Sequence, residues 1–169
     1  MATLYEYYNT GNDALAVLTT TYWKAQSFTP AISHKITSVK LYLAKTANPA
    51  GIITVSIRAT DGSGLPTGSD LASGTTDGDT LATPNEWREI TFSTGYNLVA
   101  GTKYAIVVRG DGTTNEFRWL VDISSPTYAN GSFVASTNSG TTWANETDKD
   151  MMFEDWGVGY SLSQAYIIG

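Results

Sequence analysis

Few residues in this chain are suited to catalysis. There is no cysteine, which excludes a cysteine nucleophile. The only histidine, His34, lies in the segment SHKITS at the predicted start of a strand. We interpret it as a solvated loop residue rather than as a general base. The chain contains no G-x-S-x-G motif, so nothing predicts a serine nucleophile beside this histidine.

Carboxylates are the other candidates for catalytic chemistry. A glycosidase needs only two of them, about 5–9.5 Å apart, and 16 acidic residues offer many chance pairs. The best placed are Glu86, Glu89, Glu154 and Asp155, and each lies close to arginine or tryptophan in a strand pattern. Such neighbours favour surface ion pairs over an acid and base pair. We therefore predict that the protein is not an enzyme.

Residues suited to binding sugars lie on the polar side of the predicted strands. Tyr42, Arg58 and Arg118 alternate with apolar neighbours, and Trp143 follows a turn further along the chain. An aromatic ring covers the C–H face of a sugar, while planar charged groups bind its hydroxyls. These residues form a candidate glycan site. The alternative is that they make ordinary cross-strand pairs on an outer sheet face.

The elements that position these side chains are short strands. Ile53, Val55 and Ile57 alternate with polar residues, as in a strand with one buried and one solvated face. Segments rich in Val, Ile, Thr, Tyr and Trp recur between turn-forming residues. They predict about nine strands, which are Tyr22–Phe28, Thr37–Leu43, Ile52–Ala59, Asp70–Thr75, Trp87–Phe92, Lys103–Arg109, Glu116–Asp122, Ser132–Ala135 and Asp150–Trp156.

This strand pattern predicts an all-β fold, a two-sheet antiparallel β-sandwich of the jelly-roll type. The best helix candidate, Asp13–Leu18, is short and is followed by three threonines, so we expect at most a single turn there. The alternation of the strands also predicts a core that includes Val39, Leu41, Val55, Ile57, Ile90, Phe92, Ile106, Val108, Trp119 and Phe153.

The composition restricts the classes of partner. A net charge of −6 and a pI near 4.6 disfavour binding to the phosphate backbone of nucleic acid. The N-terminus lacks a basic segment followed by an apolar one, and no apolar segment approaches the roughly 20 residues of a membrane span. We therefore expect neither signal-directed export nor membrane insertion. Without cysteine, the fold has neither disulfides nor thiolate metal sites.

Five stretches, in chain order, carry a resemblance to a known module: ITSVKLYLAK, VSIRATDGSGLPTGSDLASG, EWREITF, LVAGTKYAIVVRG and NSGTTW. Together they resemble a jelly-roll module of bacterial surface proteins and of phage or environmental viral structural proteins. Its architecture is similar to that of carbohydrate-binding modules. The resemblance implies a jelly-roll domain over residues 22–157. Outside it lie an N-terminal extension, residues 1–21, and a C-terminal segment, residues 158–169, which we interpret as an assembly tail.

Residues 136–143, STNSGTTW, are also similar to the Asp-box hairpin of sialidases and other β proteins, S-x-D-x-G-x-T-W. Asn138 stands where that motif has aspartate. The resemblance implies a structural role, in which the side chain at this position braces the turn and Trp143 packs beneath it. Asparagine can accept the same local hydrogen bonds, so we predict that the turn is kept.

The resemblance to carbohydrate-binding jelly rolls further implies a structural calcium near the meeting of the first and last strands. No other cofactor is implied. Carboxylate oxygens, which calcium prefers, are plentiful at both ends of the chain. The candidate ligands are Glu6, Asp13, Glu154 and Asp155. The segments 77–79 and 148–150 lack the later residues of a complete calcium loop, which favours plain turns there.

Both ends of the chain are rich in apolar and tyrosine residues, which suggests assembly. A tail of this kind is too apolar for a free terminus and too short for a second domain. We expect the ends to dock on other virion subunits, or on copies of this chain, by strand addition. The residues involved are Tyr5, Tyr7, Tyr8, Tyr160, Leu162, Tyr166, Ile167 and Ile168.

The expected function is therefore a non-catalytic virion structural protein, a capsid decoration or appendage subunit. It would be made in the host cytoplasm and displayed on the virion surface. The alternative is a glycan-binding module of a cell-surface or secreted protein. In either case surface glycans are possible ligands, and we expect neither nucleic acid nor membrane as a partner.

Overall fold

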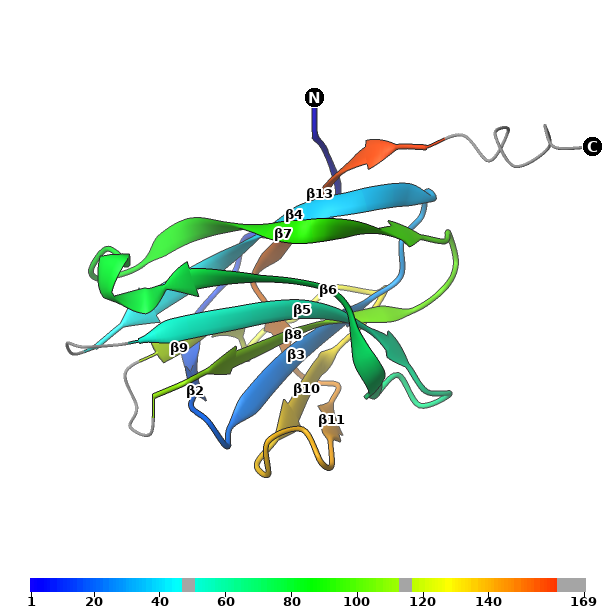
Figure 1. The fold of residues 1–169 in the computed structure, drawn as a ribbon. Coiled ribbons are helices and arrows are strands. Elements are labelled where there is room, and N and C mark those ends of the chain that lie inside the picture. The colour runs from blue at the N-terminus through cyan, green and yellow to red at the C-terminus, as the bar shows by residue number, and fades with distance from the viewer. Residues whose placement is uncertain (47–50, 113–116, 161–169) are drawn as a thin grey trace, which may run out of the picture.

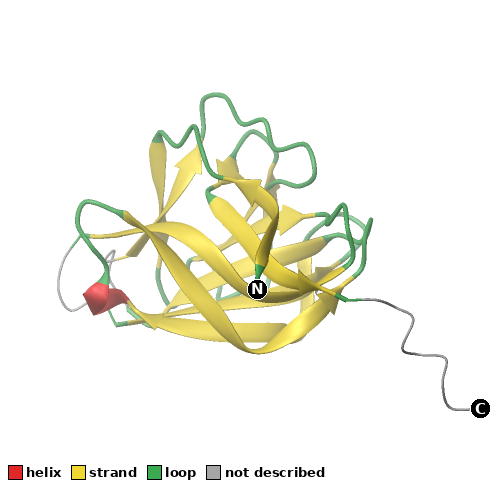
Figure 2. Ribbon diagram, turned by 90° about the horizontal axis from the view of Figure 1, so that it is seen from above, coloured by secondary structure: helices red, strands yellow, loops and turns green. Residues whose placement is uncertain are grey.

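The structure, a computed structural model, describes residues 1–46, 51–112 and 117–160. Apart from a single 3₁₀ turn, visible at one end of the molecule in Figure 2, the regular elements are strands. No helix among the described residues has the length and apolar character of a membrane span. The elements are β1 (Thr3–Tyr8), β2 (Ala14–Leu18), β3 (Trp23–Phe28), β4 (His34–Lys45), β5 (Ile52–Thr60), β6 (Pro66–Asp77), η1 (Gly78–Thr80), β7 (Glu86–Leu98), β8 (Tyr104–Gly110), β9 (Phe117–Asp122), β10 (Phe133–Ser136), β11 (Ala144–Glu146), β12 (Asp150–Met151) and β13 (Phe153–Gly159).

The strands form two antiparallel sheets, which pack face to face as a β-sandwich (Figure 1). The seven-stranded sheet has the order β1-β13-β4-β9-β12, with β2 beside β9 and β7 beside β4. The six-stranded sheet has the order β11-β10-β3-β8-β5-β6. The long strand β4 pairs along one side with β13 and then with β9, and along the other with β7. The predicted two-sheet antiparallel sandwich is confirmed.

The core lies between the sheets and follows the alternation of the strands. On β4 the side chains of Val39, Leu41 and Leu43 point inward, and on β5 those of Val55 and Ile57 meet them. These side chains are fully buried, and removing apolar surface from water is the main force that holds two sheets together. Every residue of the predicted core belongs to this cluster.

The predicted strands correspond to observed ones, with differences at their ends. The last predicted strand, Asp150–Trp156, is two strands, because β12 ends at Met151 and β13 begins at Phe153. Glu116, the first residue of another predicted strand, lies outside the described residues. Strands β1, β2 and β11 were not predicted.

The best helix candidate, Asp13–Leu18, contains no helical turn, because Ala14–Leu18 forms strand β2. Ala14, Ala16 and Leu18 face the core, while Leu15 and Val17 lie between them in sequence and face outward. Pairing with β9 provides hydrogen bonds for the backbone. Burial of one face in the sheet outweighs the weak local preference of so short a segment.

The N-terminal segment also differs from the expected extension. Strand β1 pairs with β13, and a β-bulge between Leu4 and Glu6 shifts the register. In Figure 1 the N-terminal end lies beside β13, at the edge of the seven-stranded sheet. Much of the segment 1–21 is therefore part of the sandwich, because β1 and β2 both belong to this sheet.

Candidate functional site

The clearest candidate binding site lies on the outer face of the seven-stranded sheet. Tyr42 on β4 and Trp87 on β7 are cross-strand partners, and their rings stack with centroids 5.1 Å apart and an interplanar angle of 9°. The pair packs on the small apolar cluster of Ala44, Leu120 and Met152. Both rings remain partly exposed, so they form an aromatic surface on this face of the molecule.

A hollow of about 340 Å³ lies next to this aromatic pair. We call it the outer-face hollow, and it is lined by Asn12, Asp13, Ala14, Leu15, Asn85 and Leu120. The Tyr42 hydroxyl donates a 2.6 Å hydrogen bond to Oδ1 of Asn85, which ties the aromatic pair to the hollow. The site therefore combines stacked rings with a polar recess.

Polar atoms in the outer-face hollow are available to a ligand. Oδ1 of Asp13 accepts a 2.9 Å bond from the backbone of Ile123, but Oδ2 has no protein donor among the described residues. Within the described residues, the amide nitrogen of Asn85 also donates to no protein acceptor, and the side chain of Asn12 makes no hydrogen bond. Donors and acceptors thus lie side by side, as sugar hydroxyls require.

The structure separates the predicted glycan-binding residues onto two faces. Tyr42 and Arg118 lie on the outer face of the seven-stranded sheet, where Arg118 is the cross-strand partner of Ala44. Arg58 and Trp143 lie on the outer face of the other sheet, beside Trp23. The four residues therefore cannot form one site.

On that second face, Arg58 already has protein partners. Its Nε donates to Asp70 at 2.7 Å, and Arg109 donates to the other oxygen of Asp70 at the same distance. Both guanidinium groups lie over the ring of Trp23. Burial alone would raise the pKa of Asp70, but the hydrogen bonds from the arginines hold it below its ordinary value. Arg58 therefore makes ordinary cross-strand pairs on an outer sheet face, which was the alternative to a role in glycan binding.

The hairpin at residues 136–143 has the structural role that the Asp-box resemblance implies. Oδ1 of Asn138 accepts from the hydroxyl of Ser136 at 2.9 Å and from the backbone of Thr142 at 2.9 Å. Positive φ occurs at Ser139 and Gly140, directly after Asn138. Trp143 packs against Trp23 with ring centroids 6.4 Å apart. Its ring is half-buried, as a bracing residue requires.

Each candidate calcium ligand has a protein partner among the described residues. Glu6 accepts from the backbone of Ala31 at 2.8 Å, and Glu154 accepts from Asn9 and from the indole of Trp156. Asp13 is bound to the backbone of Ile123, as described above. The neighbouring carboxylates Glu154 and Asp155 point to opposite sides of β13. Among residues 1–46, 51–112 and 117–160, no three acidic or histidine side chains converge as metal ligands.

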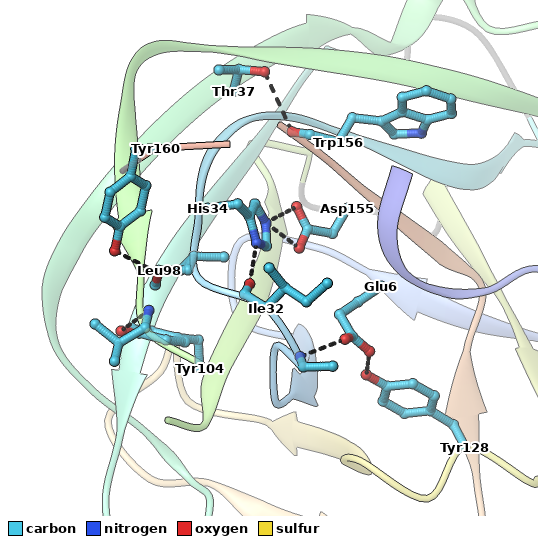
Figure 3. Close-up of polar contacts among 12 residues, drawn as sticks. Glu6, Ile32, His34, Thr37, Leu98, Tyr104, Tyr128, Asp155, Trp156 and Tyr160 are labelled. Atoms are coloured by element: carbon cyan, nitrogen blue, oxygen red, sulfur yellow. Dashed lines mark hydrogen bonds and ion pairs between the residues drawn. The ribbon is translucent and has the colours of Figure 1, made fainter. Parts of the chain in front are cut away.

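His34 on β4 and Asp155 on β13 form a buried pair (Figure 3). Nε2 of His34 lies 2.8 Å from Oδ2 of Asp155, and Nδ1 lies 2.8 Å from the carbonyl oxygen of Ile32. Both ring nitrogens therefore face oxygen acceptors, which suits the doubly protonated imidazolium. The ring of Tyr5 stacks on the imidazole at 3.7 Å, with the planes within 1° of parallel.

Burial and neighbouring charges oppose each other at this pair. Burial alone lowers the pKa of His34, but Asp155, the carbonyl of Ile32 and Glu6 raise it above its ordinary value. Burial raises the pKa of Asp155, which His34 only partly offsets. Both directions mean that the folded protein holds this proton more tightly than the unfolded chain does. Burial and Glu6 likewise raise the pKa of Tyr128, whose hydroxyl donates to Glu6.

Two sequence-based interpretations are therefore wrong. His34 is not a solvated loop residue, and Asp155 is not part of a surface ion pair, because both side chains have no exposed surface. The two residues are 121 positions apart and meet only because β13 pairs with β4.

A second pair of buried carboxylates, Asp122 and Asp150, also has structural partners. Burial alone would raise the pKa of Asp122, but bonds from the Tyr8 hydroxyl and from two backbone amides hold it below its ordinary value. Burial raises the pKa of Asp150, which accepts from the side chain of Gln26 and the backbone of Tyr128. These acids anchor the loop after β9.

The predicted assembly residues have mixed placements. Tyr5 stacks on His34 and Tyr8 donates to Asp122, so both are tied to their own sandwich. Tyr160 donates a 3.0 Å bond to the carbonyl of Leu98, also within the chain. Tyr7 has 53% of its surface exposed. The other predicted residues, Leu162, Tyr166, Ile167 and Ile168, lie outside the described residues.

Sequence reasoning identified Tyr42 but missed Trp87, Asn85 and Asn12. The alternation of β7 places Trp87 outward, which was readable from the sequence, but its pairing with Tyr42 depends on the register of β4 and β7. Comparison with family models and with curated proteins finds no match for this chain. The geometry alone therefore supports the functional argument.

Proposed function

We propose that this protein is a non-catalytic recognition module that binds glycans at the outer-face hollow. The observation that supports this most is the stacked pair of Tyr42 and Trp87 beside a recess with available amide and carboxylate groups. Ring faces bind the C–H surfaces of sugars, and amides and carboxylates bind their hydroxyls. In this proposal the sandwich corresponds to a jelly roll of the carbohydrate-binding type.

The partners of the carboxylates support a role without catalysis. Glu86 pairs with Arg88, and Glu89 accepts a 2.8 Å bond from Ser38. Glu154 accepts from two side chains, as described above. A retaining or inverting glycosidase needs two carboxyl groups facing a shared substrate site. The outer-face hollow contains a single carboxylate among the described residues, that of Asp13.

The test begins with an array of neutral and acidic oligosaccharides, followed by calorimetric titration of the best ligand. Trp87→Ala removes one ring, and we expect a loss of affinity of at least about tenfold, as for a stacked aromatic contact. Tyr22→Ala is the matched control, because Tyr22 is an exposed aromatic residue outside the hollow. Unchanged affinity in Trp87→Ala would place any sugar site elsewhere.

A second candidate function is a decoration or appendage subunit of a virion. The observation that favours it is Tyr7, which projects with 53% exposure from β1, an edge strand of the seven-stranded sheet. Edge strands offer backbone groups to which another chain can add a strand. The anchoring of Tyr5, Tyr8 and Tyr160 within the chain reduces the support for this function relative to glycan binding.

The two functions are compatible, since a subunit on the virion surface could bind host glycans. A cell-surface or extracellular location suits a recognition module equally well. Co-purification with particles tests the virion proposal, and Tyr7→Ser is the informative variant. If the wild-type protein joins particles, we expect Tyr7→Ser to reduce its incorporation. A wild-type protein that never associates with particles would exclude the virion function without affecting the glycan proposal.

A further inference from the structure

A second hollow lies at the open edge between the two sheets, away from the aromatic pair. We call it the edge hollow, and its volume is about 400 Å³. Strand β2 forms one wall, and Phe133 on β10 and Val121 on β9 lie deeper, between the sheets. In Figure 1, β3, β10 and β11 lie side by side in the lower part of the view, near β2. Leu15 and Ile123 lie at its rim, with 52% and 48% of their surface exposed.

Lys24 on β3 occupies an unusual position in this hollow. Its neighbours Trp23 and Ala25 belong to the outer face of the six-stranded sheet, so Lys24 points inward, toward the other sheet. Inward positions of a sandwich strand are normally apolar. A lysine at such a position costs stability, and departures of this kind are expected at functional sites.

In the part of the chain that the structure describes, the ammonium group of Lys24 lies over two aromatic rings but has no oxygen acceptor. Among the described residues it forms no hydrogen bond or ion pair, and it lies 5.8 Å from the ring centroid of Phe133 and 5.9 Å from that of Tyr22. The nearby carboxylate of Glu146 is bound to Lys149 instead. Burial lowers the pKa of Lys24, which Glu146 only partly offsets. A partly buried cation beside apolar walls thus lacks a direct counter-ion.

We propose that the edge hollow binds a small apolar carboxylate, with the carboxylate paired to Lys24 and the apolar tail lying against Ala16, Val121 and Phe133. Charge complementarity determines the headgroup, because an anionic acceptor would give the ammonium a counter-ion in addition to the two aromatic rings below it. The apolar walls determine the tail. The volume matches that of small-molecule sites, which usually enclose about 300–1,000 Å³.

This site is distinct from the outer-face hollow, although Ala14 and Leu15 contribute to both. Lys24 lines only the edge hollow, while Asn12, Asp13 and Asn85 line only the outer one. An unpaired cation selects an anion, whereas the amides and carboxylate of the outer hollow suit hydroxyl groups. The two proposals can therefore succeed or fail separately.

The test uses two probes of nearly equal size, hexanoate and hexan-1-ol, titrated at pH 7 and followed by backbone amide NMR. Hexanoate is expected to bind at least about tenfold more tightly than the alcohol, because only its carboxylate can form a charge-assisted hydrogen bond with Lys24. The amides of Leu15, Ile123 and Phe133 should report the binding. Saturation with hexanoate should also raise the pKa of Lys24, since a carboxylate favours the charged amine.

Lys24→Met keeps an unbranched apolar stem and removes the charge, so it should abolish the preference for hexanoate over hexan-1-ol. Its unfolding temperature, compared with that of the wild-type protein, establishes that the variant is folded. Lys103→Met, an exposed lysine outside the hollow, is the matched control and should keep the preference. Equal affinity of the wild-type protein for both probes, or a preference that survives in Lys24→Met, would overturn the proposal.

Discussion

The buried pair of His34 and Asp155 makes a quantitative prediction for stability. His34→Leu removes the imidazole and leaves the carboxylate of Asp155 buried, with Glu6 nearby and no positive charge. Breaking a fully buried ion pair by removing one partner costs about 3–5 kcal/mol of folding free energy. For a chain of this length, each kcal/mol changes the unfolding temperature by about 2–4 °C. We therefore expect a decrease of roughly 6–20 °C.

The same pair predicts how stability depends on pH. The pKa of His34 is raised in the folded protein, so its contribution is complete below the ordinary value of 6.5 and is lost as the pH rises through the folded value. The pKa of Asp155 is also raised, so its contribution is complete below the ordinary value of 3.8 and is lost as the pH rises through its own folded value. The wild-type protein should therefore become less stable above pH 6.5, by at most about 1.4 kcal/mol per pH unit for one proton.

Urea unfolding from pH 5 to 9 measures both effects. The double variant His34→Leu/Asp155→Leu should lose the decline above pH 6.5, because it removes both groups, whereas His34→Leu should keep a decline, because burial still raises the pKa of Asp155. The double variant His34→Leu/Asp155→Leu should recover much of the lost stability, because an apolar pair often replaces a buried ion pair at little cost. A single variant as stable as the wild-type protein at pH 6 would refute the buried ion pair. So would a wild-type profile that is flat above pH 6.5.

Three further predictions concern the core, the hairpin and the outer arginine network. Ile57→Asp places an unpaired charge in the fully buried core, so the protein should not fold, as circular dichroism would reveal. Asn138→Ala removes the acceptor that braces the 136–143 hairpin and should cost about 1–2 kcal/mol in urea unfolding, whereas Asn138→Asp should be nearly neutral. Asp70→Asn should weaken the loss of stability at acid pH, because the lowered pKa of Asp70 stabilises the fold above its ordinary value of 3.8 and this stabilisation is lost as the pH falls. Equal acid profiles for Asp70→Asn and the wild-type protein would contradict that assignment.

The sandwich could be predicted because its main strands are long and alternate clearly. In β4 and β5, polar and apolar residues alternate over enough positions to indicate both the strand and its buried face. Strand β2 has only five residues, so its pattern could not be distinguished from a helical turn. Its conformation depends on pairing with β9, about a hundred positions later in the chain.

The candidate site was harder to predict because it depends on which sheet each strand joins. Alternation correctly placed Tyr42, Arg58 and Arg118 outward, but it does not tell the outer face of one sheet from that of the other. Membership of β4 and β5 in different sheets is what separates Tyr42 from Arg58. The burial of His34 has the same origin, since it depends on the pairing of the chain's last described strand with β4.

The most direct test of the central claim follows the indole N–H signals of the five tryptophans by NMR while a glycan selected on the array is added. If glycans bind at the outer-face hollow, the Trp87 signal should shift as the ligand saturates. The signals of Trp23 and Trp143, on the other sheet, should stay unchanged. Shifts confined to Trp23 and Trp143 would instead place the binding site on the six-stranded sheet and contradict the proposal.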